Sequence, residues 1–156
     1  TDLVGSTTLL EAIGDEAWND LRRWHDETLR DSVAANGGEE VDHTGDGFFV
    51  SFGDAASAVS CAREIQRRLA EHRREHGFAP QVRIGLHAAE ATRAGSNYTG
   101  MGVHLAARVG AVAGAGEIIA SATSVDRLQD LELTDRRSVT LKGIAEPVEI
   151  VSIGWR

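Results

Sequence analysis

The chain has 156 residues, and its 24 acidic residues against 16 Lys and Arg residues give a formal net charge of −8 at pH 7. This length is typical of one globular domain with a sizeable core, and the acidic balance argues against a nucleic-acid-binding surface. The one cysteine, Cys61, excludes a disulfide framework within the chain, and no apolar run approaches the roughly 18 residues that a membrane helix needs. We therefore expect a cytoplasmic domain without nucleic acid or membrane contacts, in which a nucleotide site must concentrate positive charge locally.

After a short first strand at the N-terminus, a helical pattern leads into a hairpin. Apolar residues recur at helical spacing up to a stop at residues 36–38, and they are Trp18, Leu21, Leu29 and Val33. His25 lies on the same stripe, and we interpret it as a hydrogen-bonded core residue rather than a ligand. Residues 40–50 follow as a strand, a Gly-Asp-Gly turn and a second strand, which places Asp46 at the tip of a hairpin.

A second amphipathic helix and another strand complete the predicted core. The helix has an apolar face over residues 58–69, and Gly77 and Pro80 end it. Alternating apolar residues at 82–88 then predict a strand. The order strand, helix, strand, strand, helix, strand indicates an α+β fold with a ferredoxin-like βαββαβ core. We interpret Cys61 as a core residue of the helix.

Residues 103–109 contain two polar side chains, His104 and Arg108, among apolar or small residues. Since residues four apart share a helix face, both side chains project together, and an anionic ligand is the chemistry that a cation and a hydrogen-bonding ring favour. The alternative is a helix rim whose arginine pairs with a carboxylate. A short strand at 117–120 and later strands near Leu131, Val139 and Val148 are predicted to follow.

Two carboxylates in the first third of the chain are candidate metal ligands. Asp2 precedes small residues that lead into a helix, a turn type whose free N–H groups suit phosphate. Asp46 lies beside Asp2 if their strands are neighbours. Oxygen-only ligands favour Mg²⁺ or Mn²⁺, which leave the remaining positions to water and substrate phosphate. Asp46 could instead be only a turn residue.

Five motifs in a fixed order make the chain resemble the class III nucleotidyl cyclase catalytic domain. They occupy residues 1–7, 44–48, 82–87, 103–109 and 141–143. The resemblance implies one catalytic domain over residues 1–156, with the ferredoxin-like core extended by a C-terminal helix and strands. The first strand of this family normally begins several residues earlier, so we expect Thr1 to lie inside it.

The resemblance also implies the members of the site. Two Mg²⁺ or Mn²⁺ ions are expected between Asp2 and Asp46, with the Leu3 carbonyl as a further ligand. Arg108 matches the arginine that stabilises the transition state, and His104 replaces the asparagine that orients the ribose. The outer phosphates are expected to contact main-chain N–H groups and two side chains, which belong to Val4, Gly5, Ser6, Thr7, Arg83 and Lys142. Arg83 or Lys142 could instead be structural, Arg83 by pairing with an acidic neighbour.

Two further positions leave undetermined which nucleotide base the site recognises. Asp42 stands where the family has its adenine-reading lysine, and Asn97 stands where it has the aspartate partner. An ionised carboxylate only accepts hydrogen bonds, so Asp42 suits the N–H donors of guanine better than adenine N1, and uracil also offers one donor. Because bacterial members of this family are mostly adenylate cyclases, the family favours ATP while the local chemistry favours GTP.

Three function classes follow. The leading one is a metal-dependent enzyme that converts a nucleoside triphosphate to a 3′,5′-cyclic nucleotide and pyrophosphate in a head-to-tail homodimer, with metal aspartates and arginine from different protomers. The alternative is a weakened domain that binds nucleotide or dimerises as a regulatory module, and a third is a purely structural dimerisation domain. Retention of Asp2, Asp46 and Arg108 favours the enzyme.

Overall fold

The computed structural model describes residues 1–90, 92–94 and 97–156. The helices and strands, in chain order, are β1 (Asp2–Leu3), α1 (Ser6–Ile13), α2 (Asp15–Ala35), β2 (Glu39–Thr44), β3 (Gly47–Ser51), α3 (Ala55–His76), β4 (Val82–Leu86), β5 (Thr92–Ala94), β6 (Asn97–Thr99), α4 (Met101–Ala111), β7 (Ile118–Ser121), α5 (Ala122–Val125), β8 (Leu133–Val139) and β9 (Val148–Ile153). Among the described residues, no helix combines the length and the hydropathy needed to cross a membrane.

The main sheet has five strands in the order β1-β4-β7-β9-β8. Only β4 and β7 run parallel, and the other neighbours are antiparallel. The β2–β3 hairpin forms a ladder of its own, but the Phe48 N–H donates to Thr1 Oγ1 at 3.2 Å and so places β3 beside β1. The order of elements and the positions of the first four strands confirm the predicted α+β fold with its βαββαβ core.

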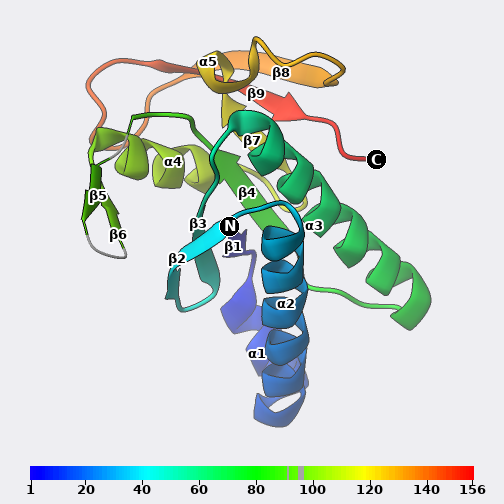
Figure 1. Cartoon of the computed structure of the whole chain (residues 1–156). Helices are drawn as coiled ribbons and strands as arrows, with labels where there is room; N and C mark the ends of the chain where they lie inside the picture. The colour runs from blue at the N-terminus through cyan, green and yellow to red at the C-terminus, as the bar shows by residue number, and fades with distance from the viewer. Residues whose placement is uncertain (91, 95–96) are drawn as a thin grey trace.

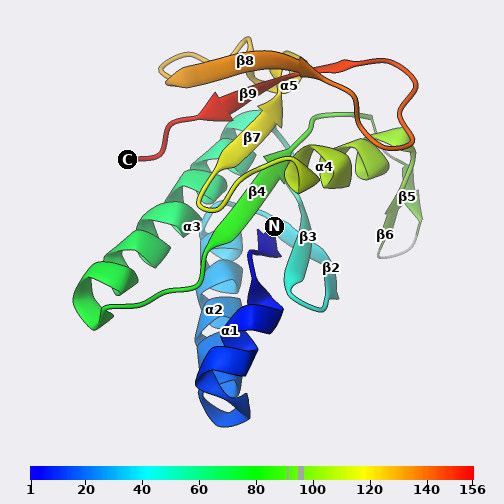
Figure 2. The same cartoon turned by 180° about the vertical axis from the view of Figure 1, so that it is seen from behind.

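Helices cover both faces of the sheet, as Figures 1 and 2 show from opposite sides. Ile118 packs in the larger core cluster with residues of α2 and α3, whereas its neighbour Ile119 packs with Val109 of α4. Successive residues of a strand point to opposite faces, so α4 lies on the face opposite to α2 and α3. All four residues of β7 are buried, as expected for a strand covered on both faces.

The α4 backbone lies directly against β4. A Cβ atom on Gly85 would stand 2.2 Å from the Gly110 nitrogen, which is closer than any real contact. The absence of side chains at this crossing therefore fixes the depth at which α4, the helix of His104 and Arg108, packs on the sheet.

The structure differs from the predicted elements in several places. The first helical region is two helices, α1 and α2, because Gly14 takes a φ of 80° between them. The strands predicted near Leu131 and Val139 are one strand, β8, and the strand predicted from residue 117 begins at Ile118. The short elements β5, β6 and α5 were not predicted, since segments of three or four residues carry no periodic signal.

Two core interpretations are confirmed. His25 is 1% exposed, and its Nδ1 lies 2.9 Å from Asp26 Oδ1 in a hydrogen bond. Cys61 is 2% exposed, and burial raises the pKa of its thiol to about 12, which suits a packing role.

Candidate functional site

The start of β1 and the turn of the β2–β3 hairpin bring Asp2 and Asp46 to one region. The hydrogen bond between the Phe48 N–H and Thr1 Oγ1 sets Asp2 beside the strand that follows Asp46. Gly45 and Asp46 form the two-residue turn between β2 and β3, and Gly45 adopts a φ of 60°. Asp46 therefore lies at the hairpin tip, as the sequence predicted.

Arg83 forms an ion pair with Asp2. Its Nε donates to Asp2 Oδ2 at 2.9 Å, its Nη2 contacts the same oxygen, and its Nη1 donates to the Ala111 carbonyl at 3.3 Å. The register of β1 and β4 sets this pair, because Asp2 lies directly opposite Arg83. This is the structural alternative that the sequence left open for Arg83, and a phosphate contact by this residue stays a proposal.

The donor chemistry of this region fits magnesium or manganese. Among the described residues, no group of three or more His, Cys, Asp or Glu side chains is arranged to hold a metal ion. Asp2 and Asp46 offer two carboxylates, and such sites are completed by water and substrate phosphates. The Asp2 carboxylate pairs with the guanidinium of Arg83, so a metal ion at Asp2 would have to displace that contact. The Leu3 carbonyl follows Asp2 along β1.

The N-terminus of α1 offers unpaired backbone donors close to Asp2. The first helical hydrogen bond runs from the Leu9 N–H to the Gly5 carbonyl at 3.0 Å. In the described part of the chain, the N–H groups of Gly5, Ser6 and Thr7 make no backbone hydrogen bond. The Val4 N–H, in contrast, donates to the Gln81 carbonyl at 2.8 Å. Val4 was expected to contact phosphate, but its N–H extends the pairing of β1 with the chain before β4, so three N–H groups are available.

On α4, His104 and Arg108 are both exposed, whereas the next residue, Val109, is completely buried. No hydrogen bond or ion pair joins either polar side chain to another described residue. The rim interpretation, in which Arg108 pairs with a carboxylate of its own chain, therefore finds no support within the described residues. As far as the described residues go, both exposed side chains are therefore available to a ligand or to a second chain.

A cleft of about 750 Å³ opens between the hairpin, β4 and α4. Its lining includes Asp2, Asp42 and Arg83, while neither His104 nor Arg108 is among the described residues that line it. The α4 residues that do line it are apolar or small: Gly102, Val103, Ala106, Ala107, Gly110 and Ala111. Thus one chain does not bring the two polar residues of α4 to the cleft of its own acidic residues.

The lining residues that were not singled out from the sequence include His87 and Tyr98. His87 ends the motif at residues 82–87, and a hydrogen bond of 2.7 Å between His87 Nδ1 and Ser121 Oγ links the end of β4 to β7. Burial lowers the pKa of His87. The motif was the available signal for His87, whereas Tyr98 lies in a strand too short to predict.

The remaining candidates lie at separate places. Lys142 is exposed in the turn after Leu141, which is 2% exposed and packs in one cluster with Val109 of α4. Lys142 is therefore anchored on the α4 side of the sheet. Asp42 is exposed at an irregularity of the β2–β3 ladder, and it lines the cleft. Asn97 begins β6, but its side chain lies outside the described part of the structure.

Comparison with known proteins identifies a family. The family described as adenylate and guanylate cyclase catalytic domain matches residues 1–153. A protein of Rhizobium meliloti (strain 1021) whose name contains the words adenylate cyclase is 32% identical over 96% of this chain. An uncharacterised protein of Mycobacterium tuberculosis is 32% identical over 94% of the chain. The chain spans 26% and 38% of the lengths of these two relatives.

Solved structures agree on the fold. The guanylyl cyclase Cya2 superposes with a TM-score of 0.86 and 26% identity, covering 97% of this chain and 87% of that structure. A structure from Silicibacter pomeroyi, described as an adenylate/guanylate cyclase/hydrolase, gives a TM-score of 0.81 and 25% identity over 97% of this chain and 91% of its own.

Proposed function

This chain belongs to the family of adenylate and guanylate cyclase catalytic domains, and on that premise we propose that it converts ATP or GTP into the 3′,5′-cyclic nucleotide and pyrophosphate in a homodimer. The observation that carries this proposal is the separation of two sets of polar residues. Asp2 lines the cleft and Asp46 lies at the hairpin tip directly before the lining residue Gly47, whereas His104 and Arg108 are exposed, do not line the cleft and have no partner among the described residues. A head-to-tail dimer joins the two sets twice, once in each site.

In the proposed site, Asp2 and Asp46 would hold two Mg²⁺ or Mn²⁺ ions, with the Leu3 carbonyl as an additional ligand. Such ions would supply Lewis acidity, which favours the ionised ribose 3′-hydroxyl and stabilises negative charge at the α-phosphate. The N–H groups of Gly5, Ser6 and Thr7 bind the outer phosphates, as the free donors at a helix N-terminus do.

The partner chain completes the site. The guanidinium of Arg108 of the partner subunit stabilises the charge that develops at the α-phosphate, and His104 of the partner subunit donates a hydrogen bond to the ribose. The 3′-oxygen forms a bond to the α-phosphorus, the bond to the bridging oxygen breaks, pyrophosphate leaves and the hydroxyl proton passes to water. Lys142 and Arg83 contact the outer phosphates, Arg83 after it leaves Asp2.

A specific observation favours a second candidate, a regulatory module that binds nucleotide without turnover. The base-reading positions hold Asp42 and Asn97, and Arg83 occupies the Asp2 carboxylate. Asp2, Asp46 and Arg108 nevertheless retain the charges that the chemistry requires, and a module without turnover has no need of all three.

The test is to incubate the purified protein with Mn²⁺ and each of the four nucleoside triphosphates, and to resolve the products by mass spectrometry. We expect one cyclic nucleotide with an equimolar amount of pyrophosphate, and its loss in Asp46→Ala. Asp20→Ala is the matched control, because Asp20 is an exposed carboxylate that pairs only with Arg23 among the described residues. Nucleotide binding without any cyclic product would contradict the enzyme and support the regulatory module.

A further inference from the structure

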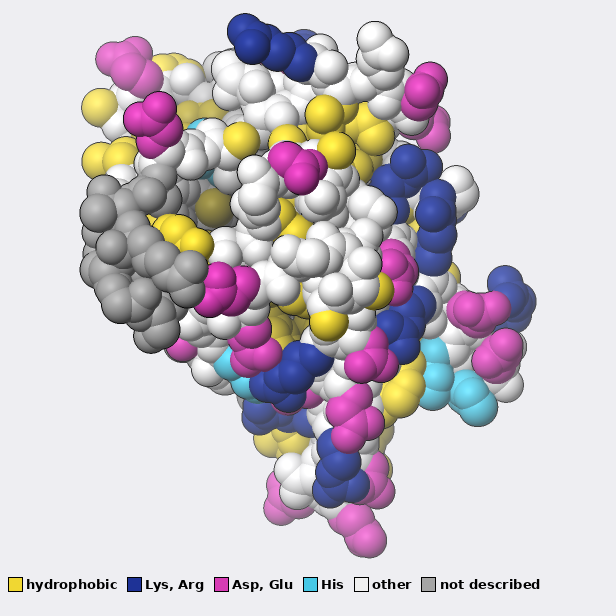
Figure 3. All heavy atoms as spheres, viewed as in Figure 1, with side chains coloured by type: hydrophobic (Ala, Val, Ile, Leu, Met, Phe, Trp, Pro, Cys, Tyr) yellow, Lys and Arg dark blue, Asp and Glu magenta, His cyan; other side chains and the backbone are white. Residues whose placement is uncertain are grey.

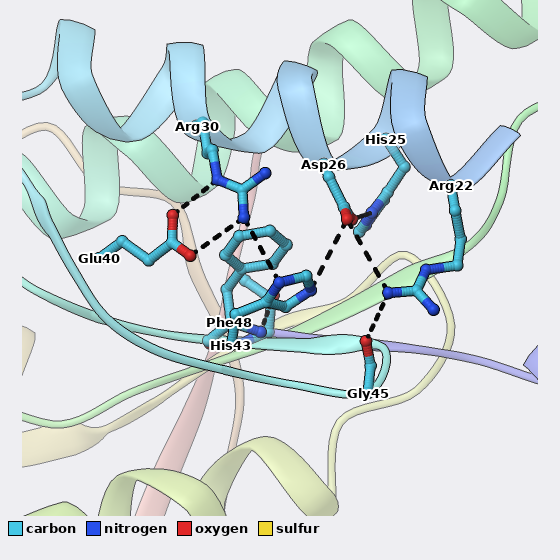
Figure 4. A network of polar contacts seen from close by, with 9 residues as sticks. Arg22, His25, Asp26, Arg30, Glu40, His43, Gly45 and Phe48 are labelled. Atoms are coloured by element: carbon cyan, nitrogen blue, oxygen red, sulfur yellow. Dashed lines mark hydrogen bonds and ion pairs between the residues drawn. The ribbon is translucent and has the colours of Figure 1, made fainter. Parts of the chain in front are cut away.

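One face of α2 contacts the hairpin that carries Asp46. Arg22, Asp26 and Arg30 lie four residues apart, so they project from the same side of the helix, and Figure 4 shows all three pointing toward β2 and β3. We refer to these three residues as the α2 polar face. Its contacts run along the hairpin from the turn to the start of β2.

Arg22 binds the turn itself. Its Nη2 donates to the Gly45 carbonyl at 3.1 Å, directly before Asp46 (Figure 4). Among the described residues, no other side chain makes a hydrogen bond to the Gly45–Asp46 turn. A guanidinium on a carbonyl is a charge-assisted hydrogen bond, which is stronger and more directional than a bond between neutral groups.

Asp26 and Arg30 hold the strand behind the turn. Asp26 Oδ2 lies 4.0 Å from Arg22 Nη2 and 3.7 Å from His43 Nε2, so its carboxylate stands between the arginine and β2. Arg30 binds Glu40 through two bonds of 2.7 and 3.1 Å, and its Nη2 lies 3.4 Å from His43 Nδ1. The hairpin is thus held by α2 at its turn, its middle and its start.

These contacts matter because the hairpin forms a ladder separate from the main sheet. Hydrogen bonds between Thr1 and Phe48 hold β3 beside β1, but the turn itself makes no ladder pairing with β1, so its position relative to Asp2 also depends on packing and on the contacts with α2. Phe48 supplies the packing, since it is 4% exposed and stacks on His43 with ring centroids 4.2 Å apart. Only Arg22 acts on the turn directly.

We propose that Arg22 is a positioning residue of the metal site, which holds the Gly45 carbonyl so that the Asp46 carboxylate points toward Asp2. This inference rests on the proposed function, because it assigns a metal to Asp46. Its consequence is specific. Loss of Arg22 weakens metal binding, whereas catalysis at saturating metal is retained, because Arg22 contacts neither nucleotide nor ion.

The test measures Mn²⁺ binding directly, from the electron paramagnetic resonance signal of free Mn²⁺, in the presence of 3′-deoxy-ATP or 3′-deoxy-GTP, which cannot cyclise. We expect Arg22→Ala to raise the Kd for Mn²⁺ by about tenfold, the lower end of the effect of residues that orient metal ligands. Arg22→Lys keeps one donor and should recover part of the affinity. Arg23→Ala is the matched control, since Arg23 is 68% exposed and pairs with Asp20.

The same variants are then assayed as cyclases over a range of Mn²⁺ concentrations. We expect the KM for Mn²⁺ of Arg22→Ala to rise by the same factor and its kcat at saturating Mn²⁺ to stay close to that of the wild type. Equal Mn²⁺ Kd values in folded Arg22→Ala and wild type would overturn the inference, as would a loss confined to kcat. If Arg22→Ala does not fold, Arg22→Lys decides by the same two measurements.

The outcomes separate the inference from the proposed function. A wild-type protein that binds Mn²⁺ with nucleotide but forms no cyclic product contradicts the cyclase proposal, and the binding comparison still tests Arg22. A wild-type protein that binds no Mn²⁺ contradicts the metal site, and the role of Arg22 falls with it.

Discussion

At the scale of single residues, an ion pair joins Asp2, a proposed metal ligand, to Arg83, a proposed phosphate contact. The Asp2 and Arg83 side chains are 44% and 32% exposed, so the pair is accessible to a competing cation. Arg83 cannot bind Asp2 and a phosphate with the same N–H groups. In the proposed site, entry of a metal ion at Asp2 would therefore release the guanidinium toward the nucleotide.

We expect Arg83→Ala to bind Mn²⁺ more tightly than the wild type in the absence of nucleotide, because the competing cation is gone. The gain should be about two- to fivefold, the equivalent of a partly exposed ion pair worth ~0.5–1 kcal/mol. Nucleotide binding should weaken in the same variant. Calorimetric titration with Mn²⁺ measures the first effect, and Arg136→Ala, which removes an exposed ion pair with Asp126, is the control. Unchanged or weaker Mn²⁺ binding would show that Arg83 does not compete.

We propose that Asp42, which lines the cleft, sets the base preference. A carboxylate that faces adenine N1 leaves two acceptors opposed, a mismatch on the order of 1–3 kcal/mol. We therefore expect GTP to be used at least as well as ATP, and the double change Asp42→Lys with Asn97→Asp to shift the ratio of kcat/KM values toward ATP. A wild-type protein that strongly prefers ATP would show that Asp42 does not read the base.

At this scale, the sequence did not predict which residues face each other. The residue types of the site follow from the motifs, but the pairing of Asp2 with Arg83 depends on the strand register, and the use of the Val4 N–H depends on how far β1 pairs. In the sequence, the residues of the α2 polar face cannot be distinguished from an ordinary charged helix surface. Only the packing of α2 on the hairpin shows that Arg22 meets Gly45.

At the scale of elements, the crossing of β4 and α4 sets where His104 and Arg108 project. Periodicity predicted both elements, because each has a regular apolar face. It could not predict the direct backbone contact of Gly85 with Gly110, which arises between residues 25 positions apart in the chain. The same limit applies to the break at Gly14, where a single positive φ divides one helical pattern into two helices.

We expect Gly85→Ala to destabilise the protein by about 1–3 kcal/mol, the usual cost of overpacking, and to reduce cyclase activity by displacing α4. Gly110→Ala should be milder, because its Cβ would meet Gly85 Cα at 3.4 Å, an ordinary contact. Gly53→Ala is the control, since nothing lies within 4 Å of the added atom. Urea unfolding followed by circular dichroism gives the order, and equal stability of all three variants would contradict the close crossing.

At the scale of the whole molecule, acidic and basic side chains are mixed over the face formed by α2 and α3 (Figure 3). Three histidines with lowered pKa values, the buried His25 and the half-buried His72 and His87, instead give the fold its dependence on pH near neutrality. Burial lowers the pKa of His25 more than its bond to Asp26 raises it, and burial also lowers the pKa of His72 and His87. His25 Nε2 is buried without a hydrogen-bond partner, which suits the neutral ring.

The sign of the pH effect follows from these directions. An unfolded histidine has the ordinary pKa of about 6.5, whereas these three rings have lowered pKa values in the folded protein and bind their protons only at lower pH. Between the folded and unfolded pKa values, the unfolded state binds more protons than the folded state. The histidines therefore contribute their full share to the free energy of unfolding above about pH 6.5, and this share is lost as the pH falls toward the folded pKa values. We expect a lower urea midpoint at about pH 5.5 than at about pH 7.5, with a smaller difference in His25→Asn. An equal difference in both proteins would exclude His25 as a contributor.

The central claim is that one chain holds two incomplete halves of a cyclase site, and mixing two inactive variants tests it most directly. Asp46→Ala lacks the metal half and Arg108→Ala lacks the other, so a heterodimer of the two retains one intact site. With random exchange of subunits, about half of the dimers are mixed and half of their sites are intact. We expect the mixture to recover about a quarter of the wild-type activity, whereas a mixture of Asp2→Ala with Asp46→Ala, both changed in the same half, should recover none. Absence of recovery in the first mixture, with heterodimers demonstrated by native mass spectrometry, would contradict the claim.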